Sequence, residues 1–209
     1  MLPDLEGCSP LLTRILAARG IQGAEDIDWT LSRLPSYRLF KDMDTAVALL
    51  FEALRRQQRI LIIGDYDADG ATATAVAVRG LRLLGAACVD YLVPSRFSYG
   101  YGLTPELAEV AMQRSPDLIV TVDNGISSHA GVIAAREAGA KILVTDHHLP
   151  PPVLPEADAI VNPNQPGCDF PGKSLAGVGV MFYVLAALRA RIRKENSLVD
   201  LPNLACLLD

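Results

Sequence analysis

ILIIGDYDADG, residues 60–70, is a short run of aliphatic residues followed at once by a turn that carries three aspartates. Two further stretches have the same form: LIVTVDNG at residues 118–125 and ILVTDHH at residues 142–148. A continuous apolar run that ends in turn residues is typical of a strand buried on both faces. The three stretches therefore predict strands of a parallel sheet, each with polar side chains at its carboxyl end.

Helical segments alternate with these runs. Two more strands are predicted at Val89–Val93 and Ala159–Val161. The predicted helices cover Ala71–Leu84, Pro105–Gln113 with Thr104 as its cap, His129–Ala138 and Val178–Lys194. Strands that alternate with helices form βαβ units. We therefore predict an α/β fold, a parallel sheet of about five strands with helices on both faces.

The residues before this alternation predict a short helical N-terminal segment. Ser9 and Pro10 have the pattern of a helix N-cap and first helical residue, and Gly20 ends that helix. A second helix is predicted from about Asp44 to Gln58. We expect a helical preface over residues 1–58 and an α/β domain over residues 59–209.

Composition excludes several classes of protein. The 209 residues carry 19 Lys and Arg against 24 Asp and Glu, a net charge of −5, which argues against a protein that coats DNA by bulk positive charge. No apolar run approaches the roughly 18–20 residues that span a bilayer, and Asp4 and Glu6 interrupt any secretory signal. The four cysteines are scattered, with no Cys-x-x-Cys pair, which predicts reduced thiols and a cytoplasmic location.

The carboxyl ends of parallel strands meet at one edge of a sheet, where ligands bind in open α/β folds. That edge receives five carboxylates and an adjacent histidine pair: Asp65, Asp67, Asp69, Asp123, Asp146, His147 and His148. So many carboxylates repel one another unless cations neutralise them. Their oxygen and nitrogen ligands suit Mn²⁺, Mg²⁺, Fe²⁺ or Zn²⁺. Two such ions add about +4 and are the usual solution for phosphoester hydrolysis.

Other interpretations of the acidic stretch fit less well. Asp-x-Asp-x-Asp-Gly also opens a calcium-binding EF-hand loop, but the twelfth position, which requires a bidentate Glu, is Val76. A phosphatase of the haloacid-dehalogenase type requires Asp-x-Asp-x-Thr, which is absent after this strand. The simplest alternative is that acidic residues at strand ends only cap the helices that follow them.

The three acidic stretches, in this order and spacing, resemble the first three motifs of the DHH phosphoesterase superfamily. VPSRFSYGYGL at residues 93–103 and SLAGVGV at residues 174–180 resemble the RecJ branch of that superfamily, whose members are 5′→3′ exonucleases specific for single-stranded DNA. The similarity implies a catalytic domain that stops before the fourth motif of the family and lacks the domains that follow it, which leaves the activity of this chain alone an open question.

The resemblance implies a role for each matching residue. Metal ligands would come from Asp65, Asp67, Asp69 and His147, and Asp123 would bridge two divalent ions, Mn²⁺ foremost, with Mg²⁺ as the alternative. Asp146 would support the site, and His148 would contact the phosphate or assist proton transfer. Water activated by the ions would attack phosphorus in line and release a 5′-mononucleotide.

Five further residues are candidates for substrate binding. Arg96 and Tyr101 would touch a phosphate and stack on a base, or form an ordinary ion pair and a packing contact. Asn124 follows the strand at 118–122 and equally fits a turn. Gly177 and Gly179 would let the backbone approach the substrate, or allow a tight turn before the last helix.

The expected function is therefore degradation of single-stranded DNA in recombination and repair. Single-strand-binding protein and a helicase are partners that the resemblance implies, and no membrane association is expected. Two alternatives remain: a hydrolase of short oligonucleotides or cyclic dinucleotides on the same core, and a scaffold in replication that has lost its metals.

Overall fold

The computed structural model describes residues 5, 7–28, 30–196 and 201–207, apart from the side chain of Arg96. The chain forms two compact units, Met1–Pro35 and Ser36–Asp209. The first unit contains α1 (Pro10–Ala18) and the 3-10 helices η1 (Ala24–Ile27) and η2 (Leu31–Arg33). Ser9 caps α1 as predicted, because its Oγ accepts a hydrogen bond of 3.3 Å from the N–H of Leu12.

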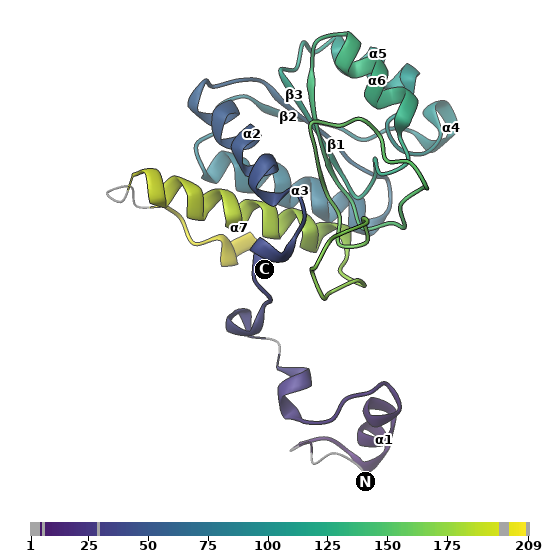
Figure 1. Cartoon of the computed structure of the whole chain (residues 1–209), viewed down its shortest axis with the longest axis vertical. Helices are drawn as coiled ribbons and strands as arrows, with labels where there is room; N and C mark the ends of the chain where they lie inside the picture. Colours follow the sequence, from purple (N-terminus) through teal and green to yellow (C-terminus); the bar gives the residue numbers. More distant parts are fainter. Residues whose placement is uncertain (1–4, 6, 29, 197–200, 208–209) are drawn as a thin grey trace. The chain divides into compact units, whose positions relative to one another are not determined.

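A single five-stranded sheet forms the centre of the second unit (Figure 1). Its strands are β1 (Ile60–Ile63), β2 (Val89–Leu92), β3 (Leu118–Val122), β4 (Lys141–Thr145) and β5 (Ala159–Val161). They lie in the order β2-β1-β3-β4-β5, and every neighbouring pair is parallel. The predicted α/β fold with a parallel sheet of five strands is confirmed.

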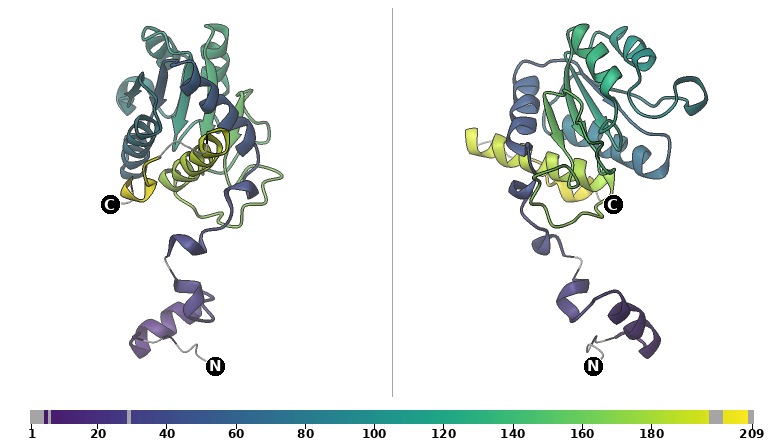
Figure 2. Two further views of the ribbon diagram at one scale, coloured as in Figure 1. Left: turned by 90° about the vertical axis from the view of Figure 1, so that its left-hand side faces the viewer. Right: turned by 45° about the vertical axis from the view of Figure 1, so that its right-hand side comes forward.

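Alternate residues of each strand pack against opposite layers of helices. In β1, Ile60 and Ile62 belong to one hydrophobic cluster, and Leu61 and Ile63 belong to the other. The first cluster joins the sheet to α2 (Met43–Arg55), α3 (Ala68–Leu83) and α7 (Gly177–Glu195). The second cluster joins it to α5 (Pro105–Met112) and α6 (His129–Glu137), on the opposite face (Figure 2). Burial on both faces explains why the strands other than β2 are largely apolar, whereas the edge strand β2 carries the exposed residues Asp90 and Tyr91.

The strand order places the acidic stretches at a topological switch point. From β1 the chain passes to β2 on one side, and it then returns to β3 on the other side of β1. The carboxyl ends of β1 and β3 are therefore neighbours whose following segments diverge, which is where open α/β sheets bind their ligands. Asp65 and Asp123 closely follow this pair of strands.

Short elements and helix ends differ from the sequence prediction. α3 begins at Ala68 instead of Ala71, because Asp67 is its N-cap and the second half of the acidic stretch forms its first turn. The short helix α4 (Arg96–Tyr99) and the 3-10 helix η3 (Tyr37–Leu39) were not predicted, and the 3-10 helix η4 (Leu204–Leu207) lies near the end of the chain. In the part of the chain that the structure describes, no helix is long and apolar enough to cross a membrane.

Candidate metal centre

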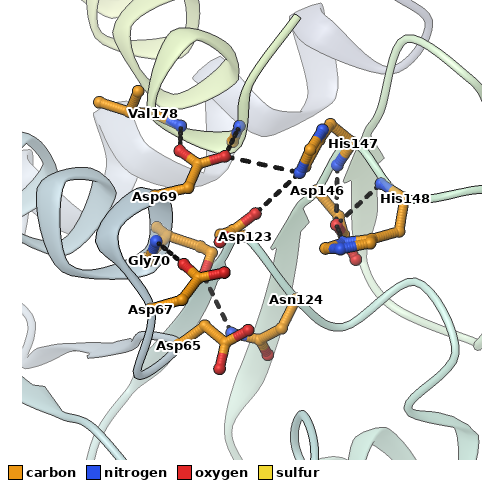
Figure 3. A network of polar contacts seen from close by, with 12 residues as sticks. Asp65, Asp67, Asp69, Gly70, Asp123, Asn124, Asp146, His147, His148 and Val178 are labelled. Carbon is orange, nitrogen blue, oxygen red and sulfur yellow. Dashed lines mark hydrogen bonds and ion pairs between the residues drawn. The ribbon is translucent and has the colours of Figure 1, made fainter. Parts of the chain in front are cut away.

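The acidic stretches and the histidine pair meet at the carboxyl edge of the sheet (Figure 3). Ligand atoms of Asp65, Asp67 and Asp123 lie within 4.8 Å of one another, and so do those of Asp123, His147 and His148. Asp123 belongs to both groups. Because one carboxylate has two oxygens, Asp123 is placed to link two neighbouring cation positions.

The loop after β1 is held by its own aspartates. Asp67 Oδ1 accepts a hydrogen bond of 2.9 Å from the N–H of Gly70, which caps α3. A Cβ atom on Gly70 would lie 2.6 Å from the backbone oxygen of Asp65, so glycine lets α3 start directly against the strand end. Asp67 therefore caps the helix that follows it, and capping occupies only one of its two oxygens.

Asp69 connects α3 with the beginning of α7. Its Oδ2 accepts a hydrogen bond of 2.7 Å from the N–H of Gly177, and its Oδ1 accepts one of 2.8 Å from the N–H of Val178. The same Oδ2 lies 3.5 Å from His147 Nε2. A carboxylate has about four lone-pair positions, so Asp69 can hold α7 and still offer an oxygen to a cation.

Asp123 is buried and has an unusual backbone conformation. Its side chain is buried and its backbone has φ +62°, a left-handed conformation that is uncommon for residues other than glycine. Oδ1 lies 3.0 Å from His147 Nε2, but this buried oxygen has no hydrogen bond of good geometry. A buried acceptor without a partner costs free energy. A divalent cation would supply that partner.

The electrostatic surroundings of Asp123 also favour a cation at this position. Burial, followed by repulsion from Asp69 and Asp67, raises its pKa to about 8. Burial also raises the pKa of Asp65. Carboxyl groups that resist ionisation in the metal-free protein ionise readily once a cation binds beside them.

Asp146 orients the histidine pair. Its Oδ1 accepts hydrogen bonds from the N–H of His147 at 2.7 Å and of His148 at 3.1 Å, and lies 2.7 Å from His148 Nδ1. Its Oδ2 accepts a hydrogen bond of 2.9 Å from the N–H of Ile126. The hydrogen bond to Asp146 raises the pKa of His148 against the opposing effect of burial. An Nδ1–H that donates to Asp146 leaves Nε2 of His148 facing the Tyr101 hydroxyl, which lies 3.4 Å from it, and available to a substrate group that displaces this contact.

The substrate-binding candidates occupy different places. The Tyr101 hydroxyl lies 3.2 Å from His148 Nδ1 and donates a hydrogen bond of 3.4 Å to the backbone oxygen of Asp123, which puts Tyr101 at the site. Asn124 is fully buried, and its Nδ2 ties together Ile63 O and Val122 O at the ends of β1 and β3. Arg96 begins α4, but its side chain lies outside the described part of the structure.

The two glycines of α7 differ. A Cβ atom on Gly177 would lie 2.6 Å from Asp123 Oδ1, so the helix meets the site closely at this residue. A Cβ atom on Gly179 would instead meet the side chain of Leu175 at 2.5 Å. Gly177 is thus part of the site, and Gly179 contacts the segment that precedes the helix.

Two asparagines that contact the histidine pair were not predicted from the sequence. Asn162 and Asn164 follow β5, and their side-chain amides donate to the backbone oxygens of His148 and His147. The rule that selected the residues after β1, β3 and β4 applies equally to β5. These asparagines were overlooked because Asn-Pro-Asn also has the composition of a turn.

Several known proteins are similar to this chain. The model of the DHH family, N-terminal domain, matches residues 59–208. A single-stranded-DNA-specific exonuclease RecJ of Escherichia coli (strain K12) is 50% identical over 204 residues, which cover 96% of this chain and 35% of the relative. The chain thus spans about a third of the length of that curated relative.

Two solved structures of RecJ from Thermus thermophilus are also similar. The complex with Mn²⁺ is 39% identical, with a TM-score of 0.69 over 86% of this chain and 25% of that one. The complex with Mg²⁺ is 32% identical, with a TM-score of 0.51 over 86% of this chain and 21% of that one. The family match contains the whole acidic cluster and its histidine pair, and the chain belongs to the DHH family.

Proposed function

We propose that this chain is the metal-dependent catalytic domain of an exonuclease that degrades single-stranded DNA from the 5′ end to 5′-mononucleotides in recombination and repair. The observation that carries the proposal is the pair of ligand groups that share Asp123. The match to exonucleases specific for single-stranded DNA, and to a relative solved with Mn²⁺ and with Mg²⁺, supports the choice of reaction and cation.

The proposal gives each residue a task. Asp65, Asp67, Asp69, Asp123 and His147 hold two divalent cations, Mn²⁺ or Mg²⁺. Divalent ions held by these residues would supply activation of water and stabilisation of the charge that develops on the phosphate. The chain's own residues orient the reactants. Asp123 is buried and belongs to both ligand groups, so it holds the two groups next to each other.

His148 and Asp146 form a second functional unit. Asp146 holds Nδ1 of His148, which leaves Nε2 to contact a phosphate oxygen or to pass a proton to the leaving group. Tyr101 is next to this imidazole and is about half exposed, so its ring can stack on a base while its hydroxyl stays at the site. Arg96 and Gly177 are kept as candidates for substrate contact, whereas Asn124 is fully buried between the ends of β1 and β3 and Gly179 packs against Leu175.

We further propose a cytoplasmic location, supported by the four free cysteines. Single-strand-binding protein and a helicase are included as partners on the family resemblance.

A calorimetric titration of Mn²⁺ tests the metal centre. We expect binding to the wild-type chain and none to Asp123→Ala. The matched control is Asp117→Asn, at the opposite end of β3, where Asp117 Oδ2 accepts the N–H of Arg59. Binding that persists in Asp123→Ala, or that is absent from the wild type, would contradict the proposed centre.

The reaction is tested with DNA labelled at the 5′ end. We expect the label to leave a single strand as a mononucleotide in the presence of Mn²⁺, with little release from a duplex and none in Asp123→Ala. Faster cleavage of dinucleotides than of long strands would favour the short-oligonucleotide alternative. Mn²⁺ binding without cleavage of any of these substrates would refute catalysis by this chain alone.

A further inference from the structure

Two asparagines hold the backbone of the histidine pair from outside the acidic cluster. Asn164 Nδ2 donates a hydrogen bond of 2.6 Å to the backbone oxygen of His147, and Asn162 Nδ2 donates one of 3.0 Å to that of His148. Both asparagines follow β5, the edge strand that contributes no metal ligand. Their amides therefore reach the loop after β4 from the neighbouring strand.

The asparagines complete a set of contacts that Asp146 begins. The two backbone N–H groups of His147 and His148 are bound by Asp146, and the two backbone oxygens are bound by Asn164 and Asn162. The histidine pair lies outside any helix or strand, so no regular hydrogen-bond ladder fixes it. Side chains hold all four of its backbone polar groups.

The Asn162–Asn164 segment is itself rigid. Asn162 is fully buried, and its Oδ1 accepts a hydrogen bond of 2.7 Å from the N–H of Asn164. Between them, the ring of Pro163 restricts the backbone, and its oxygen accepts a hydrogen bond of 2.6 Å from Lys173 Nζ. A rigid segment transmits its position to the groups that it binds.

We propose that Asn162 and Asn164 are positioning residues. Asn164 holds the backbone of His147 and thereby orients its imidazole towards the cation position, and Asn162 holds the backbone of His148 and thereby orients its imidazole. This inference rests on the proposed function. Its physical basis is that His147 Nε2 lies 3.0 Å from Asp123 Oδ1, so a small displacement of the His147 backbone separates two ligands of one group. Groups that orient metal ligands typically contribute about tenfold to a hundredfold in affinity or activity.

The first test measures Mn²⁺ affinity by calorimetry in the wild type, Asn164→Ala and Asn162→Ala. We expect binding to weaken by about tenfold or more in Asn164→Ala, and by clearly less in Asn162→Ala, since the proposed function assigns His147 to the cation and His148 to the phosphate. The matched control is Asn203→Ala, which removes a side-chain bond to the N–H of Ala205 in η4. Equal affinity in Asn164→Ala and the wild type would overturn the proposal.

The second test needs no metal. The chain has three histidines, so the ring signals of His147 and His148 can be resolved by NMR, with His129 as an internal reference. We expect Asn164→Ala to shift the His147 signals, Asn162→Ala to shift those of His148, and neither to move those of His129. If neither variant shifts the ring signals of the histidine that it contacts, the asparagines stabilise only the backbone of the loop, and the inference fails.

The two tests separate this inference from the proposed function. A wild type that binds no Mn²⁺, combined with ring signals that move as expected, would refute the metal centre and leave the positioning intact. Thermal unfolding of each variant checks the fold. If Asn164→Ala does not fold, Asn164→Ser replaces it, because serine keeps a small polar residue after Pro163 and its shorter side chain lacks the amide.

Discussion

The carboxylate of Asp69 accepts a hydrogen bond of 2.7 Å from the backbone N–H of Gly177, a residue 108 positions further along the chain. Asp69 lies in the first turn of α3, and Gly177 is the first residue of α7. The beginning of α7 has no side-chain cap from its own N-cap residue, Ala176, and is capped instead by a residue of the acidic cluster. This contact therefore contributes both to the stability of the fold and to the geometry of the site.

Replacement of Asp69 by Ala and by Asn should separate these two roles. Both variants remove the charge that repels Asp123, so the difference between them isolates the helix cap. We expect Asp69→Ala to have a lower free energy of unfolding than Asp69→Asn, by about 1 kcal/mol, because Asn still offers an acceptor. Urea unfolding measures this difference, and both variants should bind Mn²⁺ more weakly. Equal stability would show that the cap contributes nothing.

Asp123 should make the metal-free protein less stable at high pH. Its pKa rises from its ordinary value near 4 to about 8, so between these values the folded state binds a proton that the unfolded state does not. The free energy of unfolding then falls as pH increases over that range. Asp123→Asn imitates the protonated form and should be more stable than the wild type at pH 8.5, on the order of a few kcal/mol.

Thermal unfolding in the presence of a chelator, at pH 4 and pH 8.5, measures the effect. The gap between wild type and Asp123→Asn should close at pH 4, where the wild-type carboxyl is protonated. Curves for the two proteins that run parallel across the range would show that Asp123 is ionised in the fold.

Cation binding should release protons at neutral pH. Because the pKa of Asp123 is about 8 in the metal-free protein, most molecules carry its proton at pH 7, and a divalent cation must displace it. We expect release of about one proton per Asp123. Calorimetric titrations in buffers of different ionisation enthalpy give this number, and binding should strengthen as pH rises towards 8. Heats that do not depend on the buffer would contradict the prediction.

The two glycines near the start of α7 should tolerate substitution differently. In Gly177→Ala, the new methyl group would lie 2.6 Å from Asp123 Oδ1 and 2.7 Å from Asp123 Cβ, both atoms of a buried side chain. We expect the free energy of unfolding to fall by about 1–3 kcal/mol, with weaker Mn²⁺ binding.

Gly179→Ala is the matched control for this substitution. Its methyl group would meet a terminal atom of Leu175, a partly exposed side chain that can rotate. The higher helix propensity of alanine also offsets strain, so we expect little change in stability and unchanged Mn²⁺ binding. Similar losses in both variants would mean that helix packing, and not the contact with Asp123, determines the effect.

The sequence predicted the sheet well because its strands are short, apolar and bounded by turn residues. β1, β3 and β5 begin and end where the pattern placed them, since burial on both faces leaves few polar positions inside a strand. The meeting of Asp65, Asp123 and His147 followed from the same pattern, because parallel strands end at one edge.

Other features depend on contacts that no local pattern records. The bond between Asp69 and Gly177 joins two segments that are remote in sequence, and its two partners form ordinary motifs by themselves. The start of α3 at Ala68 was missed because an aspartate-rich turn and a capped first helical turn have the same composition. Asn162 and Asn164 follow a strand as the acidic residues do, but their contacts with the histidine pair depend on β4 and β5 lying side by side.

The long separation between Asp69 and α7 also orders events during synthesis of the chain. A ribosome adds about 5–20 residues per second, so the N–H groups of Gly177 and Val178 are made roughly 5–20 s after Asp69. Until then, Asp69 is part of the nascent chain but the helix whose N–H groups bind its carboxylate has not been made. The contacts that hold Asp69 can therefore form only late in synthesis, after every strand of the sheet is already present in the chain.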